Sequence, residues 1–331
     1  MLNAWAESTH KAYSSGILAY HVYCDKMEIP EEKRTPTSQL VIASFIASMA
    51  GAYSGASISN YIYGIRAWHI LHGLKWELNQ LKTDALLKGA DCMTLSSSKK
   101  KKRQPYTPEF MSRIHEQLNL EDLLDTTVFA CLTTCFYSAA QLGEFLIPRL
   151  DSFNSFQHIT IAAIRSERNQ GNQEVMALYI PHTKAAPIEG EDVFWSRQPG
   201  PTDPYQALDN YQQVNNPSIN DHLFSYKHRN RMRPLTKPAF IKCVPGTAGT
   251  AGLEPLQGHG IRIDTTLFYL LKGVPIETIK VMGRWSSDAF LCYLHKHAQI
   301  LTPYIQANSE LHNSFTHFII SNSQPILQAR H

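Results

Sequence analysis

An abrupt change in composition at residues 96–106 most constrains the fold of this chain. The stretch SSSKKKKRQP follows a long series of apolar segments and contains five consecutive cations. Serine, lysine and proline in such a run are typical of a linker. The 331 residues are enough for two domains that each bury a core. We therefore expect domains at 1–95 and 107–310, joined by this linker and followed by a tail at 311–331 that packs on its own domain or on a neighbouring protomer.

The first 95 residues carry the spacing of helices and no competing alternation of strands. We expect Thr9 to cap a helix over HKAYSSGILAYHVYCDKM, and Pro36 to lie in the first turn of the next helix. Isoleucines then recur at helical spacing over 58–65, before Gly73 ends the run. The pattern predicts a small helical domain.

The second domain mixes helical patterns with short strands. Thr107 and Pro108 have the residue types of a helix cap and first helical position, and the apolar residues 120–146 predict a buried helix. Strand-like runs occupy HITIAAI, EVMALYI and EDVFW, which are residues 158–164, 174–180 and 191–195. We therefore predict a mainly helical α+β fold with a small antiparallel sheet.

Composition excludes several classes of protein. Hydrophobic residues make up 43% and charged residues 18%, and no apolar run reaches the roughly 18 residues of a membrane span. No basic segment followed by an apolar one opens the sequence, so we expect no secretory signal. The six cysteines are scattered without a CxxC pair, which argues against a disulfide framework and a zinc site. Cys131 and Cys135, four apart on a helical pattern, are expected in the core.

Positive charge is concentrated in two places, although the formal net charge is only +3. This distribution predicts a focused contact with a polyanion. The linker cluster is either a strap along a nucleic-acid backbone, a nuclear-import signal or a solvated connection. The candidate DNA-binding residues are Lys99, Lys100, Lys101, Lys102 and Arg103 in the linker, and Lys227, Arg229, Arg231 and Arg233 in the second cluster.

The stretch GHGIRI places His259 and Arg262 three residues apart at the start of a helical pattern. One helical turn puts both side chains on one face, where unpaired N–H groups also favour an anion. The pair is therefore a candidate phosphate site. The alternative is a solvated histidine beside an arginine in a surface ion pair.

Four segments of the second domain occur in the order found in one enzyme family: AAQLGEFLIPRL, IPHTKAAP, GHGIRI and MGRWSSDAFLCYL. Over about residues 107–306 the chain resembles the catalytic domain of the tyrosine recombinases, the phage-integrase superfamily. The sequences of these motifs most resemble those of the recombinases of crypton-type eukaryotic mobile elements. The resemblance implies that the helical domain at 1–95 is the family's core-binding, SAM-like DNA-binding domain.

The resemblance implies a role for five side chains in DNA strand transfer. Tyr293 would attack a phosphodiester and form a covalent 3′-phosphotyrosyl link. Arg262 would bind the nonbridging oxygens, and His259 would shuttle a proton or donate a hydrogen bond to the same phosphate. Lys184 would protonate the leaving 5′ oxygen. Trp285 would donate its indole N–H to the phosphate and pack against the helix of the nucleophile.

Structural alternatives to these roles stay open. The alternative for Tyr293 is an ordinary amphipathic aromatic, which is also an alternative for Tyr269 and Tyr304, and the alternative for Lys184 is a solvated turn residue. Trp285 is otherwise a packing residue. It precedes Tyr293 by eight residues, whereas the family commonly shows nine, so its neighbour Arg284 is the alternative for this position.

The chain departs from the family at position 141, where the family has an arginine and this chain has Gln141. Glutamine donates a hydrogen bond but carries no charge, so we expect impaired catalysis. Arg149 lies eight residues further on, too far to replace it, and Glu144 keeps an acidic position suited to accepting structural hydrogen bonds. Asp264 is either a helix-surface acid or a neighbour of the phosphate that partly offsets Arg262.

Two functional hypotheses follow. The first is a tyrosine recombinase for double-stranded DNA, weakened at position 141 and assembled as four protomers on two DNA sites, with the segment after about residue 310 docking on a neighbour. The second is an inactive, domesticated DNA-binding or regulatory protein. Neither needs a metal or nucleotide cofactor. We expect a nuclear location if the protein is eukaryotic, and a cytoplasmic one otherwise.

Overall fold

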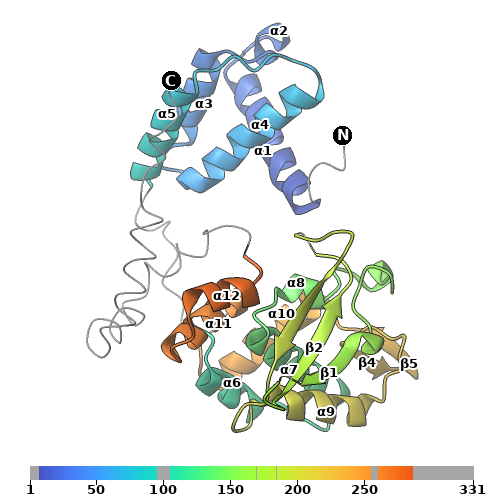
Figure 1. Ribbon diagram of the computed structural model, residues 1–331. Coiled ribbons are helices and arrows are strands. Elements are labelled where there is room, and N and C mark those ends of the chain that lie inside the picture. Colours follow the sequence, from blue (N-terminus) through green and yellow to red (C-terminus); the bar gives the residue numbers. More distant parts are fainter. Residues whose placement is uncertain (1–6, 95–104, 169, 184, 255–259, 286–331) are drawn as a thin grey trace. The chain divides into compact units, whose positions relative to one another are not determined.

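The computed structural model describes residues 7–94, 105–168, 170–183, 185–254 and 260–285, and it divides into two compact units between Lys102 and Arg103 (Figure 1). Most of the expected linker and the whole expected tail therefore lie outside the described residues. Helices dominate both units, and the second also holds a small antiparallel sheet. The predicted α+β, mainly helical class is confirmed. No helix in the described part of the chain is long and apolar enough to cross a membrane.

Helices are the main elements of the first unit over its described residues, 7–94. Their bounds are α1 Glu7–Lys26, α2 Glu31–Arg34, α3 Gln39–Met49, α4 Gly55–Leu71 and α5 Gln80–Cys92. Helices α1 and α4 pack at two glycines, because a Cβ at Gly16 would lie 2.6 Å from the Cα of Tyr61 and one at Gly64 would lie 2.8 Å from the carbonyl oxygen of Tyr13. The isoleucines at 58, 62 and 65 all lie in the core, as their spacing predicts.

Two predicted helix starts in this unit are wrong. Helix α1 already begins at Glu7, so Thr9 lies inside it. Helix α3 is capped by Ser38, whose hydroxyl accepts a hydrogen bond from the N–H of Val41, and Pro36 lies before this cap. A side chain that accepts an otherwise unpaired N–H fixes a helix start more strongly than a proline nearby.

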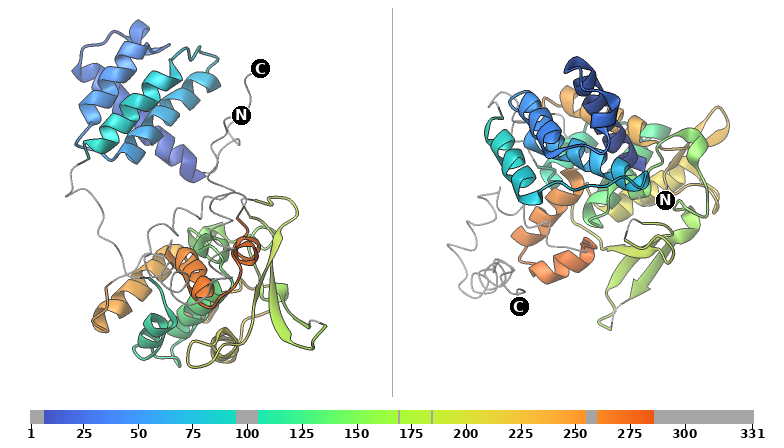
Figure 2. Two further views of the ribbon diagram at one scale, coloured as in Figure 1. Left: turned by 60° about the vertical axis from the view of Figure 1, so that its left-hand side comes forward. Right: turned by 90° about the horizontal axis from the view of Figure 1, so that it is seen from above.

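The second unit is organised around helix α7, Leu123–Tyr137, in which every residue from Thr126 to Tyr137 is buried. Figures 1 and 2 show the sheet on one side of this helix and helices α11 and α12 on the other. Cys131 and Cys135 are fully buried, which confirms their place in the core. The other helices are α6 Pro108–His115, α8 Leu142–Phe145, α9 Pro204–Asn215, α10 Lys237–Thr250, α11 Gly260–Leu271 and α12 Ile276–Met282, with short 3-10 helices at Leu150–Ser152 and Ile161–Ala163.

The expected start of α6 is confirmed, but the single helix expected over 120–146 is wrong. Thr107 accepts a hydrogen bond from the N–H of Phe110, and Pro108 is the first helical residue. The longer segment breaks after Tyr137, because Ala139 adopts a left-handed φ of 53°. A new short helix, α8, follows with Gln141 as its N-cap. Both halves are apolar, so hydrophobic periodicity alone does not reveal the break.

The sheet has the order β1–β2–β3 with antiparallel pairing, formed by β1 Ile164–Arg168, β2 Glu174–Ile180 and β3 Glu191–Trp195. Strands β2 and β3 match the expected segments. The strand expected over 158–164 is wrong, because Ile161–Ala163 form a 3-10 helix and β1 starts at Ile164. Strand β1 is an edge strand with mostly polar, exposed residues, so it lacks the apolar signal of its partners.

A two-stranded hairpin, β4 Ser225–His228 and β5 Arg231–Pro234, forms where the sequence showed only a basic cluster. Arg229 and Asn230 join the strands with φ values of 49° and 61°. Two successive left-handed residues are the conformation of a tight turn whose twist matches paired strands. The many cations conceal the strand pattern, which explains why we missed this element.

Candidate active site

The carboxyl end of α7 positions helix α11, which carries Arg262. The last carbonyls of a helix lack partners within it. Here the hydroxyl of Thr265 donates to the carbonyl of Phe136 at 2.7 Å, and the hydroxyl of Tyr269 donates to that of Tyr137 at 2.8 Å. These two contacts fix α11 on the helix that leads into α8.

Arg262 lies in the first turn of α11 and is only 8% exposed. Its Nη2 donates a hydrogen bond to the carbonyl oxygen of Gly283. Its guanidinium carbon lies 4.1 Å from the ring centroid of Trp285, which is a cation–π contact. A Cβ at position 283 would clash with the indole ring of Trp285, so a side chain there would displace this ring. The structure thus brings together Arg262 and Trp285, two of the predicted site residues.

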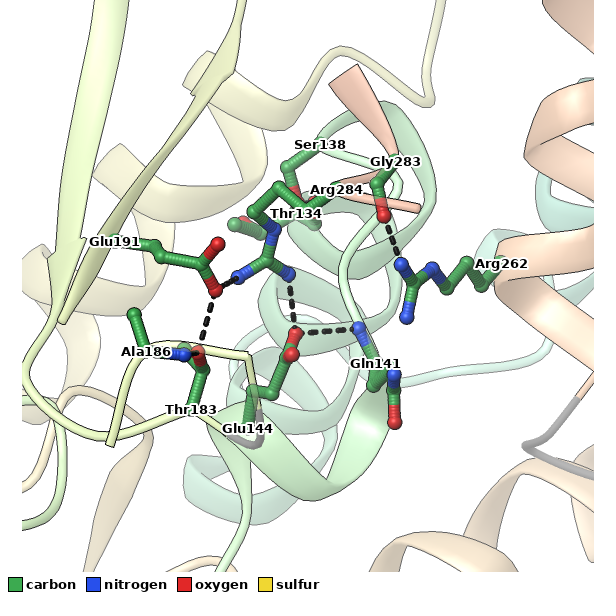
Figure 3. Close-up of polar contacts among 10 residues, drawn as sticks. All are labelled: Thr134, Ser138, Gln141, Glu144, Thr183, Ala186, Glu191, Arg262, Gly283 and Arg284. Carbon is green, nitrogen blue, oxygen red and sulfur yellow. Dashed lines mark hydrogen bonds and ion pairs between the residues drawn. The ribbon is translucent and has the colours of Figure 1, made fainter. Parts of the chain in front are cut away.

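Arg284 lies between Gly283 and Trp285 in the sequence, and its side chain binds two carboxylates (Figure 3). Its Nη2 lies 2.5 Å from Oε2 of Glu144, and its Nη1 lies 3.4 Å from Oε2 of Glu191. The side chains are 10%, 14% and 24% exposed for Arg284, Glu144 and Glu191, so the pairs are largely shielded from water. The sequence marked Arg284 only as an alternative to Trp285; its nine-residue spacing from Tyr293 was the available signal.

Gln141 is connected to this cluster through its backbone. The N–H of Gln141 donates to Oε2 of Glu144 at 2.8 Å, and the N–H of Glu144 donates to the carbonyl of Gln141 at 2.8 Å. The two bonds close the single turn of α8. The prediction that Glu144 accepts structural hydrogen bonds is confirmed.

The turn between β2 and β3 contacts the same carboxylate of Glu191. The hydroxyl of Thr183 donates to Oε2 of Glu191 at 2.5 Å, and the N–H of Ala186 donates to Oγ1 of Thr183 at 2.9 Å. A continuous polar chain therefore runs from this turn through Glu191, Arg284 and Glu144 to α8 (Figure 3).

Several predicted site residues lie outside the described part of the chain. They are Lys184, His259, Tyr293 and the linker cations Lys99, Lys100, Lys101, Lys102 and Arg103. Their predicted roles stay predictions. Of the predicted catalytic set, Gln141, Arg262 and Trp285 are described, and the contacts above connect all three to one cluster.

Three residues left open by the sequence have structural roles. Burial raises the pKa of Tyr269, whose hydroxyl is committed to a backbone carbonyl, so this tyrosine is poorly suited to act as a nucleophile. Arg149 pairs with Asp151 on the surface at 3.2 Å, with 77% of its side chain exposed. Asp264 is 1% exposed and accepts a hydrogen bond from the N–H of Tyr106 at 2.9 Å, so it is not a helix-surface acid.

The hairpin β4–β5 presents the second predicted basic cluster. Lys227, Arg229 and Arg231 are exposed, and Arg233 is half-buried. No carboxylate among the described residues forms an ion pair with any of these four cations. The hairpin can therefore offer its charge to an external anion. Within the described ranges, no group of three His, Cys, Asp or Glu side chains is arranged to hold a metal ion.

No family model and no curated protein matches the chain, but solved structures share its fold. One is the XerH site-specific recombinase bound to a palindromic difH substrate, with 15% identity, a TM-score of 0.59 and coverage of 90% of this chain and 79% of that one. Another is the Tn1549 transposon integrase with transposon right end DNA, at 11% identity, a TM-score of 0.53 and coverage of 96% and 95%. A lambda integrase dimer bound to a COC′ core site shows 13% identity, a TM-score of 0.50 and coverage of 88% and 89%. These structural neighbours are tyrosine recombinases and integrases, and the expected fold is confirmed.

Proposed function

We propose that this chain is a DNA-binding, tyrosine recombinase-like protein that breaks and rejoins DNA at specific sites. The observation that carries the proposal is the buried guanidinium of Arg262, fixed by Gly283 and Trp285 at the start of α11, within this fold. A rigid, preorganised guanidinium is suited to the charge that develops on a phosphate in the transition state. The structural neighbours are complexes with DNA, which supports DNA as the substrate.

The proposed reaction proceeds by two exchanges at one phosphorus atom. The hydroxyl of Tyr293 passes its proton to His259 as its oxygen attacks the phosphodiester, and the bond from phosphorus to the 5′ oxygen breaks as Lys184 protonates that oxygen. Arg262 and His259 bind the phosphate during this step. A 5′ hydroxyl then attacks the phosphotyrosyl link, releases Tyr293 and restores the phosphodiester. The energy of the broken bond is kept in the covalent link, so the reaction needs no nucleotide.

Gln141 weakens this site in the proposal. Losing one preorganised donor to the transition state typically costs about two to three orders of magnitude in rate. Glutamine at 141 therefore also favours a second function, a domesticated protein that binds DNA in a structural or regulatory role without cutting it. Both functions use the same DNA-binding surface.

The proposed DNA contacts come from the linker cations and the hairpin β4–β5. Cations without local acids are suited to phosphate contacts, which position a protein on a duplex without reading its sequence. We further propose assembly as a tetramer on two DNA sites, with the tail at 311–331 exchanged between protomers. An origin in a crypton-type mobile element and a nuclear location complete the proposal.

The experiment that tests the function is a search for a protein–DNA adduct that survives SDS, using a library of nicked duplexes. The unmodified chain is compared with Gln141→Arg and Tyr293→Phe. An adduct that Tyr293→Phe abolishes supports the recombinase, and one that needs Gln141→Arg supports an impaired recombinase. Adducts in no variant, with retained DNA binding, support the second function.

A further inference from the structure

We propose that Arg284 is a positioning residue for the reaction proposed above, because its guanidinium holds the β2–β3 turn against α8 through Glu191 and Glu144. The inference rests on the proposed function at one point: Lys184, which lies between β2 and β3 in the sequence, is taken to protonate the leaving 5′ oxygen. The contacts that form the clamp are present in the protein itself. We use the name clamp for Arg284, Glu144 and Glu191 together.

The clamp joins two segments that lie far apart in the sequence. Glu144 belongs to α8 and Glu191 is the first residue of β3. Both carboxylates contact the same guanidinium and are mostly shielded from solvent. Without the cation, two negative charges would remain near each other with little water to screen them. The segments would then separate or admit water.

The geometry requires arginine and not lysine. The two nitrogens of one planar fork point to two different carboxylates, with Nη2 on Glu144 and Nη1 on Glu191. A lysine ammonium is a single point charge on a flexible stem and lacks this fixed fork. Arg284 also adopts a left-handed φ of 52°, an uncommon conformation for a residue with a side chain. The conformation comes from the end of α12, where the N–H of Arg284 donates to the carbonyl of Val281 and the N–H of Trp285 donates to that of Lys280, the pattern of a helix cap with a left-handed residue.

The clamp extends into the β2–β3 turn through shared hydrogen bonds. Oε2 of Glu191 accepts from both Arg284 and Thr183, and Oγ1 of Thr183 accepts from the N–H of Ala186. The N–H of Gly190 donates to the carbonyl of Ala186 at 3.2 Å. Residues 183 and 186 flank position 184 in sequence. Releasing Glu191 therefore loosens the residues that flank position 184 in the sequence.

The first test measures amide hydrogen exchange in the full chain without DNA. In Arg284→Gln, we expect the amides of Ala186 and Gly190 to exchange about tenfold faster, because local opening becomes easier. Arg165→Gln is the matched control, since Arg165 binds Asp192 on the same sheet at 2.6 Å but forms no ion pair with any of the three clamp residues. We expect that control to leave both amides unchanged. Equal exchange in Arg284→Gln and the parent chain would overturn the clamp, whatever the chain does to DNA.

A second variant covers the case in which Arg284→Gln does not fold. Glu191→Gln keeps an acceptor for Thr183 but removes the charge that Arg284 binds. We expect it to accelerate the same two amides by a smaller factor. Unchanged amides in this variant would count against the clamp.

The third measurement separates positioning from general stability in whichever chain forms the DNA adduct. The substrate carries sulfur in place of the bridging 5′ oxygen at the cleaved phosphate. A thiol has an ordinary pKa of about 8.5, so its thiolate leaves without a proton from Lys184. We expect Arg284→Gln to slow cleavage of the oxygen substrate about a hundredfold, as misplacement of a reacting group does. Cleavage of the sulfur substrate should stay near the parent rate.

Arg284→Lys should fall between the parent and Arg284→Gln on the oxygen substrate. If sulfur restores no rate to Arg284→Gln, Arg284 does not act through Lys184 and the positioning role is wrong. If the parent and Gln141→Arg chains form no adduct, the proposed function fails, while hydrogen exchange still decides whether the clamp exists.

Discussion

The cluster around Arg284 and the hairpin β4–β5 use arginine in opposite ways. Arg262 is buried and the Arg284 side chain is only 10% exposed, and both bind groups of the protein itself: Arg284 binds two carboxylates, and Arg262 binds a carbonyl and an indole ring. Arg229 and Arg231 are exposed and meet no carboxylate among the described residues. A guanidinium that is shielded from water and bound to protein groups is held in one geometry. An exposed guanidinium can instead attract external anions, without selecting one sequence or structure. The difference predicts that the first region determines rate and stability and the second determines affinity.

The largest expected effect is on the rate, in Arg262→Gln. Removing this guanidinium takes away a charged, preorganised donor, so adduct formation should fall by about a thousandfold in whichever chain forms the adduct. The measurement is the single-turnover rate on a saturating nicked duplex. Arg149→Gln is the control, because 77% of the Arg149 side chain is exposed and its guanidinium pairs with nearby Asp151. A similar loss in both variants would show that surface charge and not the buried cluster controls the rate.

A buried side chain without a charged partner stays neutral, and His222 allows a test of this effect on stability. Burial, with a smaller contribution from nearby His158, lowers the pKa of His222 to about 4, although its bond with Phe224 opposes the shift. The unfolded chain binds a proton at an ordinary pKa of about 6.5. This contribution to stability is therefore complete above about pH 6.5 and is lost as the pH falls towards 4. The loss amounts to about 3 kcal/mol.

Urea unfolding at pH 7 and pH 4.5 measures this dependence. In His222→Asn the carboxamide oxygen can replace Nδ1 as the acceptor for the N–H of Phe224, but the residue does not titrate. We expect its free energy of unfolding to fall less between the two pH values than that of the parent. Identical slopes in the parent and His222→Asn would rule out this role.

The sequence predicted the parts of this molecule that depend on local chemistry. The cap at Thr107 and strands β2 and β3 were found because hydroxyl caps and apolar strands leave direct signals. The edge strand β1 and the basic hairpin were missed because their backbone pairing needs no apolar side chains. The resemblance placed Arg262 and Trp285 in one site, and the structure brings these two side chains into contact, while their roles stay predictions. The clamp was not predicted, because Glu144, Glu191 and Arg284 are far apart in sequence and only tertiary folding brings them together.

A smaller effect on stability is expected at Asp264, a buried acid that contacts backbone. In Asp264→Ala the N–H of Tyr106 loses its acceptor inside the protein. An unpaired buried donor costs about 1–3 kcal/mol, so urea unfolding should show a loss in this range. Asp151→Ala is the matched surface control, since 73% of the Asp151 side chain is exposed. If the free energy of unfolding falls equally in the two variants, burial does not determine how much these carboxylates contribute to stability.

The smallest expected effect is on DNA affinity, in the hairpin double variant Arg229→Gln/Arg231→Gln. Each cation that leaves a phosphate contact lowers the slope of log K against log salt by about 0.9 on duplex DNA. We expect weaker binding at low salt, a shallower slope by up to about two units and an unchanged free energy of unfolding. The control is Arg113→Gln, whose exposed side chain already pairs with Glu116 and donates to the carbonyl of Ala251. A double variant that unfolds more easily but binds DNA with the parent slope would reverse the comparison, because the hairpin cations would then act inside the protein as Arg284 does.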